Sequence, residues 1–352
     1  MLITTATELP RLMRCIGSRL MPAALPIEHR TEAMDEGNAA DWLAEQLFAG
    51  ESVAVGTKAP NGWVVTDDMV ENVHVYLKAL DCGDMQVETT HGSETWQVRG
   101  RADHISFRDG VLTVDDLKYG WRIVEPEMNW TLISHAIGWS TQNDVKIDRV
   151  VLRIIQPRPY HPQGPVRAWA FDGNMLALYL RDIDTRLFSP SDELTSGIEQ
   201  CAKCHALAGC PAARRASMNA IDVEQDMAFS DDLPNDILAH EYEVLDQAAD
   251  MVKMVRDARK ELLTYRIQSG QVVQGYALKQ RQGQRAWIAG MSGKALSAAT
   301  GVDLIKDGVV TPAEAERRGV DKALVTALTS RPIIGTKLER IDADAIGRKI
   351  FG

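Results

Sequence analysis

The chain has 352 residues, enough for about two domains, and its 45% hydrophobic and 25% charged residues are ordinary for a globular protein. No run approaches the roughly 20 apolar residues of a membrane helix and the N-terminus has no signal-peptide pattern, so we expect a cytoplasmic protein without a membrane partner. The formal net charge of -10 argues against nonspecific coating of nucleic acid, but residues 253–352 carry 18 Lys and Arg against 10 Asp and Glu, which leaves a nucleic-acid surface open.

The first part of the chain alternates between helical and strand patterns. Its clearest signal is a hairpin, because two apolar runs flank the turn Asp109-Gly110. Strands joined by a helix indicate an α/β or α+β fold. The expected elements, in chain order, are a helical region over 1–50, a helix at 67–80, a strand at 95–99, the hairpin, a helix at 127–141, strands at 149–159 and 166–171, and a helical region over 173–200.

A cysteine-rich segment and an acidic stretch separate this region from the C-terminal third. Apolar residues at helical spacing predict a long helix at 237–268. Residues 270–288 read as a short hairpin with a basic face, and 295–349 as short helices. We therefore predict a core over 1–220, an acidic linker over 221–236, and a mainly helical, basic region over 237–352.

The predicted hairpin carries a group of charged residues. Residues two apart on a strand share a face, so Asp116 and Lys118 project together, and Asp103 comes from the preceding strand. Two carboxylates suit Mg²⁺ or Mn²⁺, and Lys118 could stabilise a phosphodiester transition state. Asp115 is a register alternative that would face away from Lys118. A solvated hairpin with a surface ion pair stays open as an alternative.

The string GRAD…DLK, with a helix after it, resembles the PD-(D/E)XK nuclease superfamily, specifically its RecB-type branch. The resemblance implies a restriction-endonuclease-like α/β core, with a mixed central sheet flanked by helices. It implies Asp103, Asp116 and Lys118 as catalytic residues, and Asp103, Asp116 and the backbone carbonyl of Leu117 as metal ligands. Where the branch has an upstream helical histidine, this chain has Asp41, which could be a further ligand.

The helix after the lysine departs from the resemblance. The branch carries a glutamine and a tyrosine four residues apart, and this chain offers Thr131 and His135 at the corresponding positions. We predict DNA contacts there. A core role for His135 is the equal alternative.

The cysteines form a second pattern, C-x2-C-x5-C, at Cys201, Cys204 and Cys210. Five cysteines in a large chain do not indicate a disulfide framework. RecB-type nucleases with an iron–sulfur cluster carry three such cysteines and one upstream, so the resemblance implies a [4Fe-4S] cluster completed by Cys15. Zinc is the alternative, with His205 or Cys82 as a substitute ligand, and unligated thiols are another.

The resemblance continues into GYALKQRQGQRAW, and the whole chain looks like a family of phage- and prophage-encoded RecB-like proteins. Cations beside aromatic rings suit nucleic-acid contacts, so Lys279, Arg281, Arg285 and Trp287 are candidate DNA-binding residues. A solvated basic hairpin whose aromatics pack on the long helix is the alternative.

Together these features lead us to expect a metal-dependent deoxyribonuclease, an exonuclease acting at DNA ends in phage recombination or DNA processing. The alternative is a DNA-binding or scaffold protein on a nuclease fold that has lost activity. DNA, a phage single-strand annealing protein and a second copy of the chain are the partners that the resemblance implies.

Overall fold

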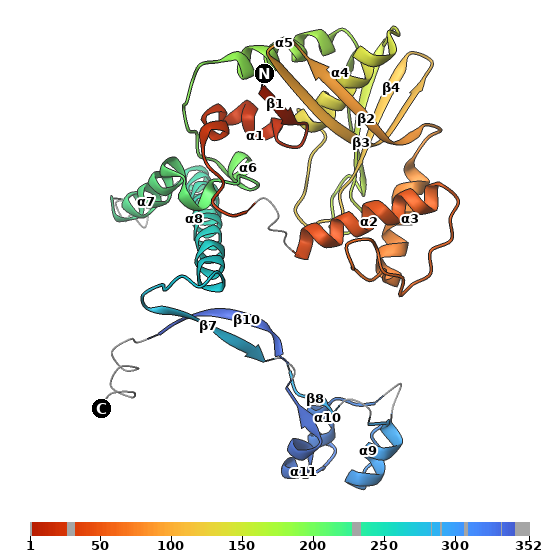
Figure 1. Ribbon diagram of the computed structural model, residues 1–352, viewed down its shortest axis with the longest axis vertical. Coiled ribbons are helices and arrows are strands. Elements are labelled where there is room, and N and C mark those ends of the chain that lie inside the picture. Colours follow the sequence, from red (N-terminus) through yellow and green to blue (C-terminus); the bar gives the residue numbers. More distant parts are fainter. Residues whose placement is uncertain are drawn as a thin grey trace. The chain divides into compact units, whose positions relative to one another are not determined.

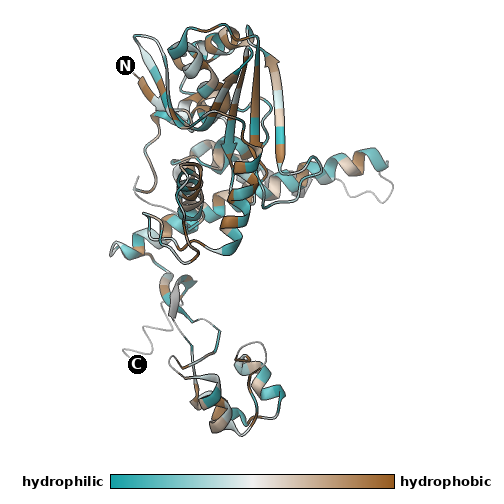
Figure 2. Ribbon diagram, turned by 90° about the vertical axis from the view of Figure 1, so that its right-hand side faces the viewer, coloured by the Kyte–Doolittle hydropathy of each residue, from teal (hydrophilic) through white to brown (hydrophobic). Residues whose placement is uncertain are grey.

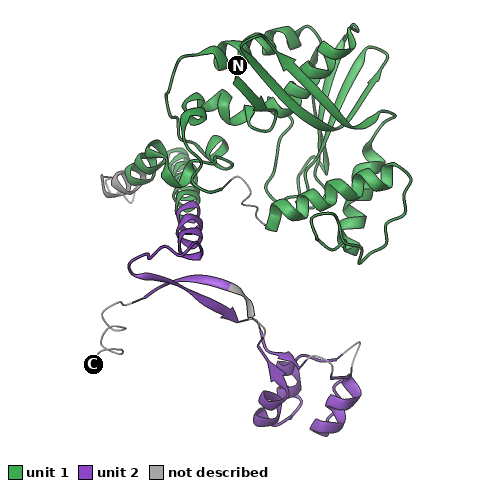
Figure 3. Ribbon diagram, viewed as in Figure 1, with its two compact units in different colours: residues 1–256 green, residues 257–352 purple. Residues whose placement is uncertain are grey.

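The computed structural model describes residues 2–26, 32–226, 234–282, 284–288, 291–305, 309–331 and 333–341. Its contacts divide the chain into two compact units, residues 1–256 and 257–352 (Figure 3). Helix α7, Pro211–Asp226, occupies the first residues of the segment predicted as an acidic linker, and residues 227–233 lie outside the described residues.

A six-stranded mixed sheet forms the centre of the first unit (Figure 1). The strands are β1 Leu2–Thr5, β2 Asp84–Gly92, β3 Trp96–Arg108, β4 Val111–Leu117, β5 Arg149–Ile155 and β6 Val166–Asp172. Strand β3 pairs with β2, with β1 and with β4, and the path then continues through β5 to β6. The pairs β1–β3 and β4–β5 are parallel, and the others are antiparallel. This confirms the expected α/β class with a mixed sheet.

Helices pack on the sheet in two groups. Helices α1 Leu9–Arg14, α4 Trp130–Asn143 and α5 Met175–Phe188 contribute to the main apolar core with the sheet. Helices α2 Glu32–Phe48 and α3 Asp67–Ala79 form a second core with the ends of β4 and β5. In Figure 2 the strands of the sheet mix hydrophobic and hydrophilic residues, and most apolar residues of β4 and β5 are buried in the core.

The expected helices and strands of the first unit are confirmed from the hairpin to β6. The prediction that residues 1–50 are helical was wrong for β1, and β2 was not predicted. Both strands depend on pairing with β3, which lies far along the chain from β1. A four-residue strand that forms through a distant partner has no local signal of its own.

The last helices of the first unit lie within and after the cysteine segment. Helix α6 covers Ile198–Cys201, a single 3₁₀ turn covers Leu207–Gly209, and the long helix α8 runs over Asn235–Gln268. Helix α8 confirms the predicted long helix, and the division between the units falls within it.

The described residues of the second unit after α8 form two small antiparallel pairs and three short helices. Strand β7, Tyr276–Gln282, pairs with β10, Ile333–Arg340, and β8, Ala286–Trp287, pairs with β9, Thr329–Ser330. The prediction of a hairpin over 270–288 was therefore wrong, because β7 and β8 each find a partner near the end of the chain. The helices are α9 Gly293–Thr300, α10 Pro312–Arg317 and α11 Lys322–Ala327, around a small core.

Candidate active site

The β3–β4 hairpin brings the predicted carboxylates together at the carboxyl end of β4. The strand register places His104 opposite Asp115, so Asp103 lies beside Asp116 on the neighbouring strand. An Asp103 carboxylate oxygen accepts a hydrogen bond of 2.8 Å from the Leu117 amide. The Lys118 ammonium forms an ion pair with Asp116. Asp103, Asp116 and Lys118 thus share one site.

Asp41 of helix α2 joins this group. Burial, together with the negative charges of Asp116 and Glu45, raises its pKa from 3.8 to about 6 against the opposing charge of Lys118. These interactions place the Asp41 carboxyl within the field of the hairpin carboxylates. Asp41, at the position where the sequence resemblance implies a histidine, therefore adds an acidic group to the site.

The electrostatics of the site are those of crowded carboxylates around one cation. Burial, together with the charges of Asp116 and Asp41, raises the pKa of Asp103 well above its usual range. Burial lowers the pKa of Lys118, but the attraction of Asp116 and Asp103 outweighs it and the net shift is upward. Lys118 is therefore a charged ammonium at neutral pH, and the acids around it include Asp103, Asp116 and Asp41.

Asp115 belongs to the opposite side of β4. It is fully buried, accepts a hydrogen bond of 2.8 Å from His104 Nδ1, and pairs with the guanidinium of Arg153. Neighbouring side chains of a strand point to opposite faces, so Asp115 lies on the face opposite Asp116 and its partner Lys118. The expectation that Asp115 faces away from Lys118 is confirmed, and its role is to anchor β4 against β3 and β5.

Helix α4 places His135 inside the protein. Its ring is 3% exposed, and Nδ1 forms a 2.7 Å hydrogen bond with the Thr89 hydroxyl. Burial lowers the pKa of His135 to about 4, so the ring is neutral at physiological pH. The position favours the core interpretation of His135. Thr131 is half-buried in the first turn of the same helix, and the DNA contacts of both residues stay predictions.

The four cysteines singled out from the sequence interact electrostatically with one another, but among the described residues no three of them are arranged to share a metal ion. Cys15, Cys201 and Cys210 are buried, and Cys204 is half-buried. Burial raises the pKa of the Cys201 and Cys204 thiols, and the other thiols of the set raise both further. Cys82 is exposed and does not appear among these interactions. The His205 ring contacts the Met21 carbonyl at 3.0 Å.

Lys203 links the cysteine loop to the carboxylates, and the sequence analysis missed it. Burial lowers the pKa of Lys203, and the charges of Lys118 and Arg122 lower it further, while Asp116 raises it. The loop between Cys201 and Cys204 thus adds a second ammonium near the hairpin. The sequence signal for Lys203 was its position between two clustered cysteines.

The candidate basic residues of the second unit have partners of their own. Lys279 Nζ lies 2.9 Å from Glu339, and Arg285 lies 2.7 Å from Glu316. The Trp287 indole donates to the Val310 carbonyl at 2.7 Å and packs on the small core. Trp287 therefore stabilises the second unit, and its predicted packing on the long helix is replaced by packing on this core. Arg281 is exposed and lines a pocket of about 560 Å³ together with Gln280, Gln282 and Lys337.

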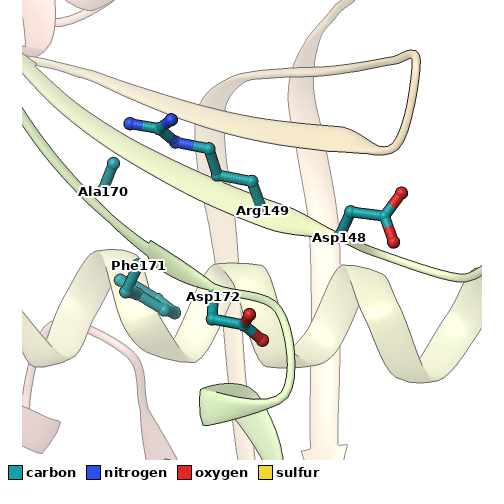
Figure 4. A pocket seen from close by; sticks show the side chains of 5 residues that line it. All are labelled: Asp148, Arg149, Ala170, Phe171 and Asp172. Carbon is teal, nitrogen blue, oxygen red and sulfur yellow. The ribbon is translucent and has the colours of Figure 1, made fainter.

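Two further observations concern ligands. Within the described ranges, no three Cys, His, Asp or Glu side chains are arranged to share a metal ion. A pocket of about 300 Å³ lies where β5 begins and β6 ends, at the opposite end of β5 from the carboxylates (Figure 4).

None of the described helices has the length and apolar character needed to cross a membrane.

The chain belongs to the family described as "Protein of unknown function (DUF2800)", whose model matches residues 9–332. No curated protein matches it in sequence. Among solved structures, the protein SSO0001 is 16% identical over 60% of this chain and 87% of its own, with a TM-score of 0.29. The "Putative exonuclease" from Eubacterium rectale is 11% identical over 65% of this chain and 90% of its own, with a TM-score of 0.31. At these TM-scores neither structure defines the function of this chain.

Proposed function

We propose that this protein is a metal-dependent nuclease of the PD-(D/E)XK type that hydrolyses DNA from its ends. The observation that carries the proposal is the gathering of Asp103, Asp116 and Asp41 around Lys118 at the end of β4. When all three carboxyls are ionised they exceed the charges of Lys118 and Lys203, which leaves an excess of negative charge in a largely buried site. Such an excess is costly unless a cation or a proton balances it.

The connections of the sheet support the same proposal. An antiparallel hairpin carries both acids and the lysine, helix α4 follows, and β5 then returns parallel to β4. This order matches the α/β core that the sequence resemblance implies.

The donor set fits a hard divalent cation such as Mg²⁺ or Mn²⁺, which prefers oxygen ligands. Asp103, Asp116 and the Leu117 carbonyl would hold it, with Asp41 as a further ligand, and it would supply Lewis acidity to the phosphodiester and to the attacking water. The raised pKa values of Asp41 and Asp103 come from crowding and burial, which are the conditions that a bound cation relieves.

Lys118 is the group that would act on the substrate directly. Its ammonium remains protonated because Asp116 and Asp103 stabilise the charge. A fixed positive charge beside the acids would stabilise negative charge that develops on a phosphate oxygen. Lys203 would add a second positive charge from the cysteine loop.

The cysteine set supports a structural metal group as part of the proposal. The Cys201 and Cys204 thiols, whose pKa values burial and the neighbouring thiols raise, would be stabilised as thiolates by iron or zinc. Cys15 follows α1, and Cys201 ends α6, so a [4Fe-4S] cluster there would tie the N-terminus to the loop that carries Lys203.

The test is cleavage of end-labelled linear DNA, in single-stranded, blunt and tailed forms, with Mg²⁺, with Mn²⁺ and with a chelator. We expect metal-dependent loss of the terminal label from at least one form. The exposed Asp84→Asn variant is a control that keeps full activity. Salt-dependent DNA binding without cleavage of any form would contradict the nuclease proposal and favour a DNA-binding protein on this fold.

A further inference from the structure

The loop after β4 exposes a tryptophan three residues beyond Lys118. The side chain of Trp121 is 66% exposed, which is unusual for so large an apolar surface. The guanidinium of Arg158 lies 4.6 Å from the centre of its ring and 4.4 Å from the centre of the Tyr119 ring. A guanidinium on one face of an exposed indole leaves the other face to solvent.

The neighbouring backbone is held in place by a buried glutamine. Gln156 Nε2 donates to the Gly120 carbonyl at 2.7 Å and to the Arg122 carbonyl at 2.8 Å, on the two sides of Trp121. Gln156 is itself fully buried and accepts from Arg167 at 2.8 Å. The exposure of Trp121 is therefore built into the fold rather than a property of a loosely held loop.

Arg158 is also fixed. Its side chain is 12% exposed, forms an ion pair of 2.9 Å with Glu36, and donates to the Tyr119 carbonyl at 3.2 Å. The partner of the indole is thus ordered by helix α2, which also carries Asp41. A guanidinium on an aromatic ring contributes favourable cation–π energy and orders the ring.

Positive charge is found near this tryptophan. Arg158 lies against its ring, Arg122 is the next residue, and the charges of Arg122 and Lys118 both act on Lys203. An exposed aromatic ring near several cations is the combination that binds single-stranded nucleic acid, since bases stack on the ring and phosphates pair with the cations.

We propose that Trp121, backed by Arg158, is a stacking platform for an unpaired base of a DNA strand whose backbone passes the carboxylate site. The position of the strand rests on the proposed function. Stacking on the indole does not require cleavage, so the two can be tested separately.

The test measures binding of a labelled oligothymidylate by fluorescence anisotropy in buffer without Mg²⁺ or Mn²⁺. Stacking contributes about 1–3 kcal/mol per base, so Trp121→Ala should weaken binding about tenfold, and Trp121→Phe should retain most of the affinity. Phe188→Ala removes an aromatic ring that is 68% exposed and should leave binding unchanged. An oligonucleotide of the same length made of abasic sites should bind the wild type and Trp121→Ala equally.

Three results would overturn the platform: wild-type protein that binds no oligothymidylate, equal affinity of the wild type and Trp121→Ala, or an equal loss on the abasic strand. The cleavage assay tests the proposed function separately from the stacking platform. Base-dependent binding through Trp121 in a protein that cleaves no DNA would refute the nuclease and keep the platform. DNA cleavage by a protein whose oligothymidylate binding does not depend on Trp121 would refute the platform and keep the nuclease.

Discussion

Replacement of Asp41 by asparagine should stabilise the protein in the absence of divalent metal. Burial and neighbouring acids raise the pKa of Asp41 from 3.8 to about 6, so the folded state binds its proton more tightly than the unfolded state. By linkage, stability falls as pH rises from about 4 through about 6. This pKa shift lowers the free energy of unfolding by as much as about 3 kcal/mol at neutral pH. The neutral amide of asparagine removes this loss.

Urea unfolding measures this directly, at about pH 7.5 and about pH 4, in metal-free buffer. Asp41→Asn should be more stable than the wild type at the higher pH, and the gain should fall below about 1 kcal/mol at the lower pH, because Asp41 is then protonated in the folded state and about half ionised in the unfolded state. Asp84→Asn, at an exposed carboxylate, should change stability by less than about 0.5 kcal/mol. Millimolar Mn²⁺ should stabilise the wild type more than Asp41→Asn. Equal stabilities at neutral pH, or a gain of the same size at low pH, would refute the reasoning.

Three further predictions follow from buried groups. Burial lowers the pKa of His135 to about 4, so the free energy of unfolding falls as pH decreases from 7 to 5. Measured by urea unfolding, the free energy of unfolding of His135→Gln should fall by about 2 kcal/mol less than that of the wild type over this range. Arg153→Met leaves the fully buried Asp115 without its guanidinium and should cost about 3–5 kcal/mol, whereas an unchanged urea midpoint would contradict the charged pair. Cys15→Ser should lower the bound iron or zinc and the melting temperature, and the exposed Cys82→Ser should change neither.

Much of the first unit could be predicted because its signals are local. The Asp109-Gly110 turn fixes the hairpin, and alternation along β4 then assigns Asp116 and Lys118 to one side and Asp115 to the other. These features depend on neighbours in sequence, and the structure reproduces them.

The remaining features depend on contacts between distant segments. Strand β7 pairs with β10, and the intervening residues contain no pattern that selects this partner over β8. Lys203 interacts with Lys118 and Asp116, which lie far from it in the chain, and the residues around Lys203 carry no signal for that interaction. The exposure of Trp121 depends on Gln156, whose amide contacts could not be predicted from the sequence around it.

The central claim is that Asp116 and Lys118 belong to a hydrolytic site, and single-turnover cleavage of end-labelled DNA tests it most directly. Asp116→Asn and Lys118→Met should each reduce the cleavage rate at least about 100-fold, with DNA affinity within a few-fold of the wild type, because they remove stabilisation of the transition state rather than binding. Cleavage at the wild-type rate by both variants would contradict the account.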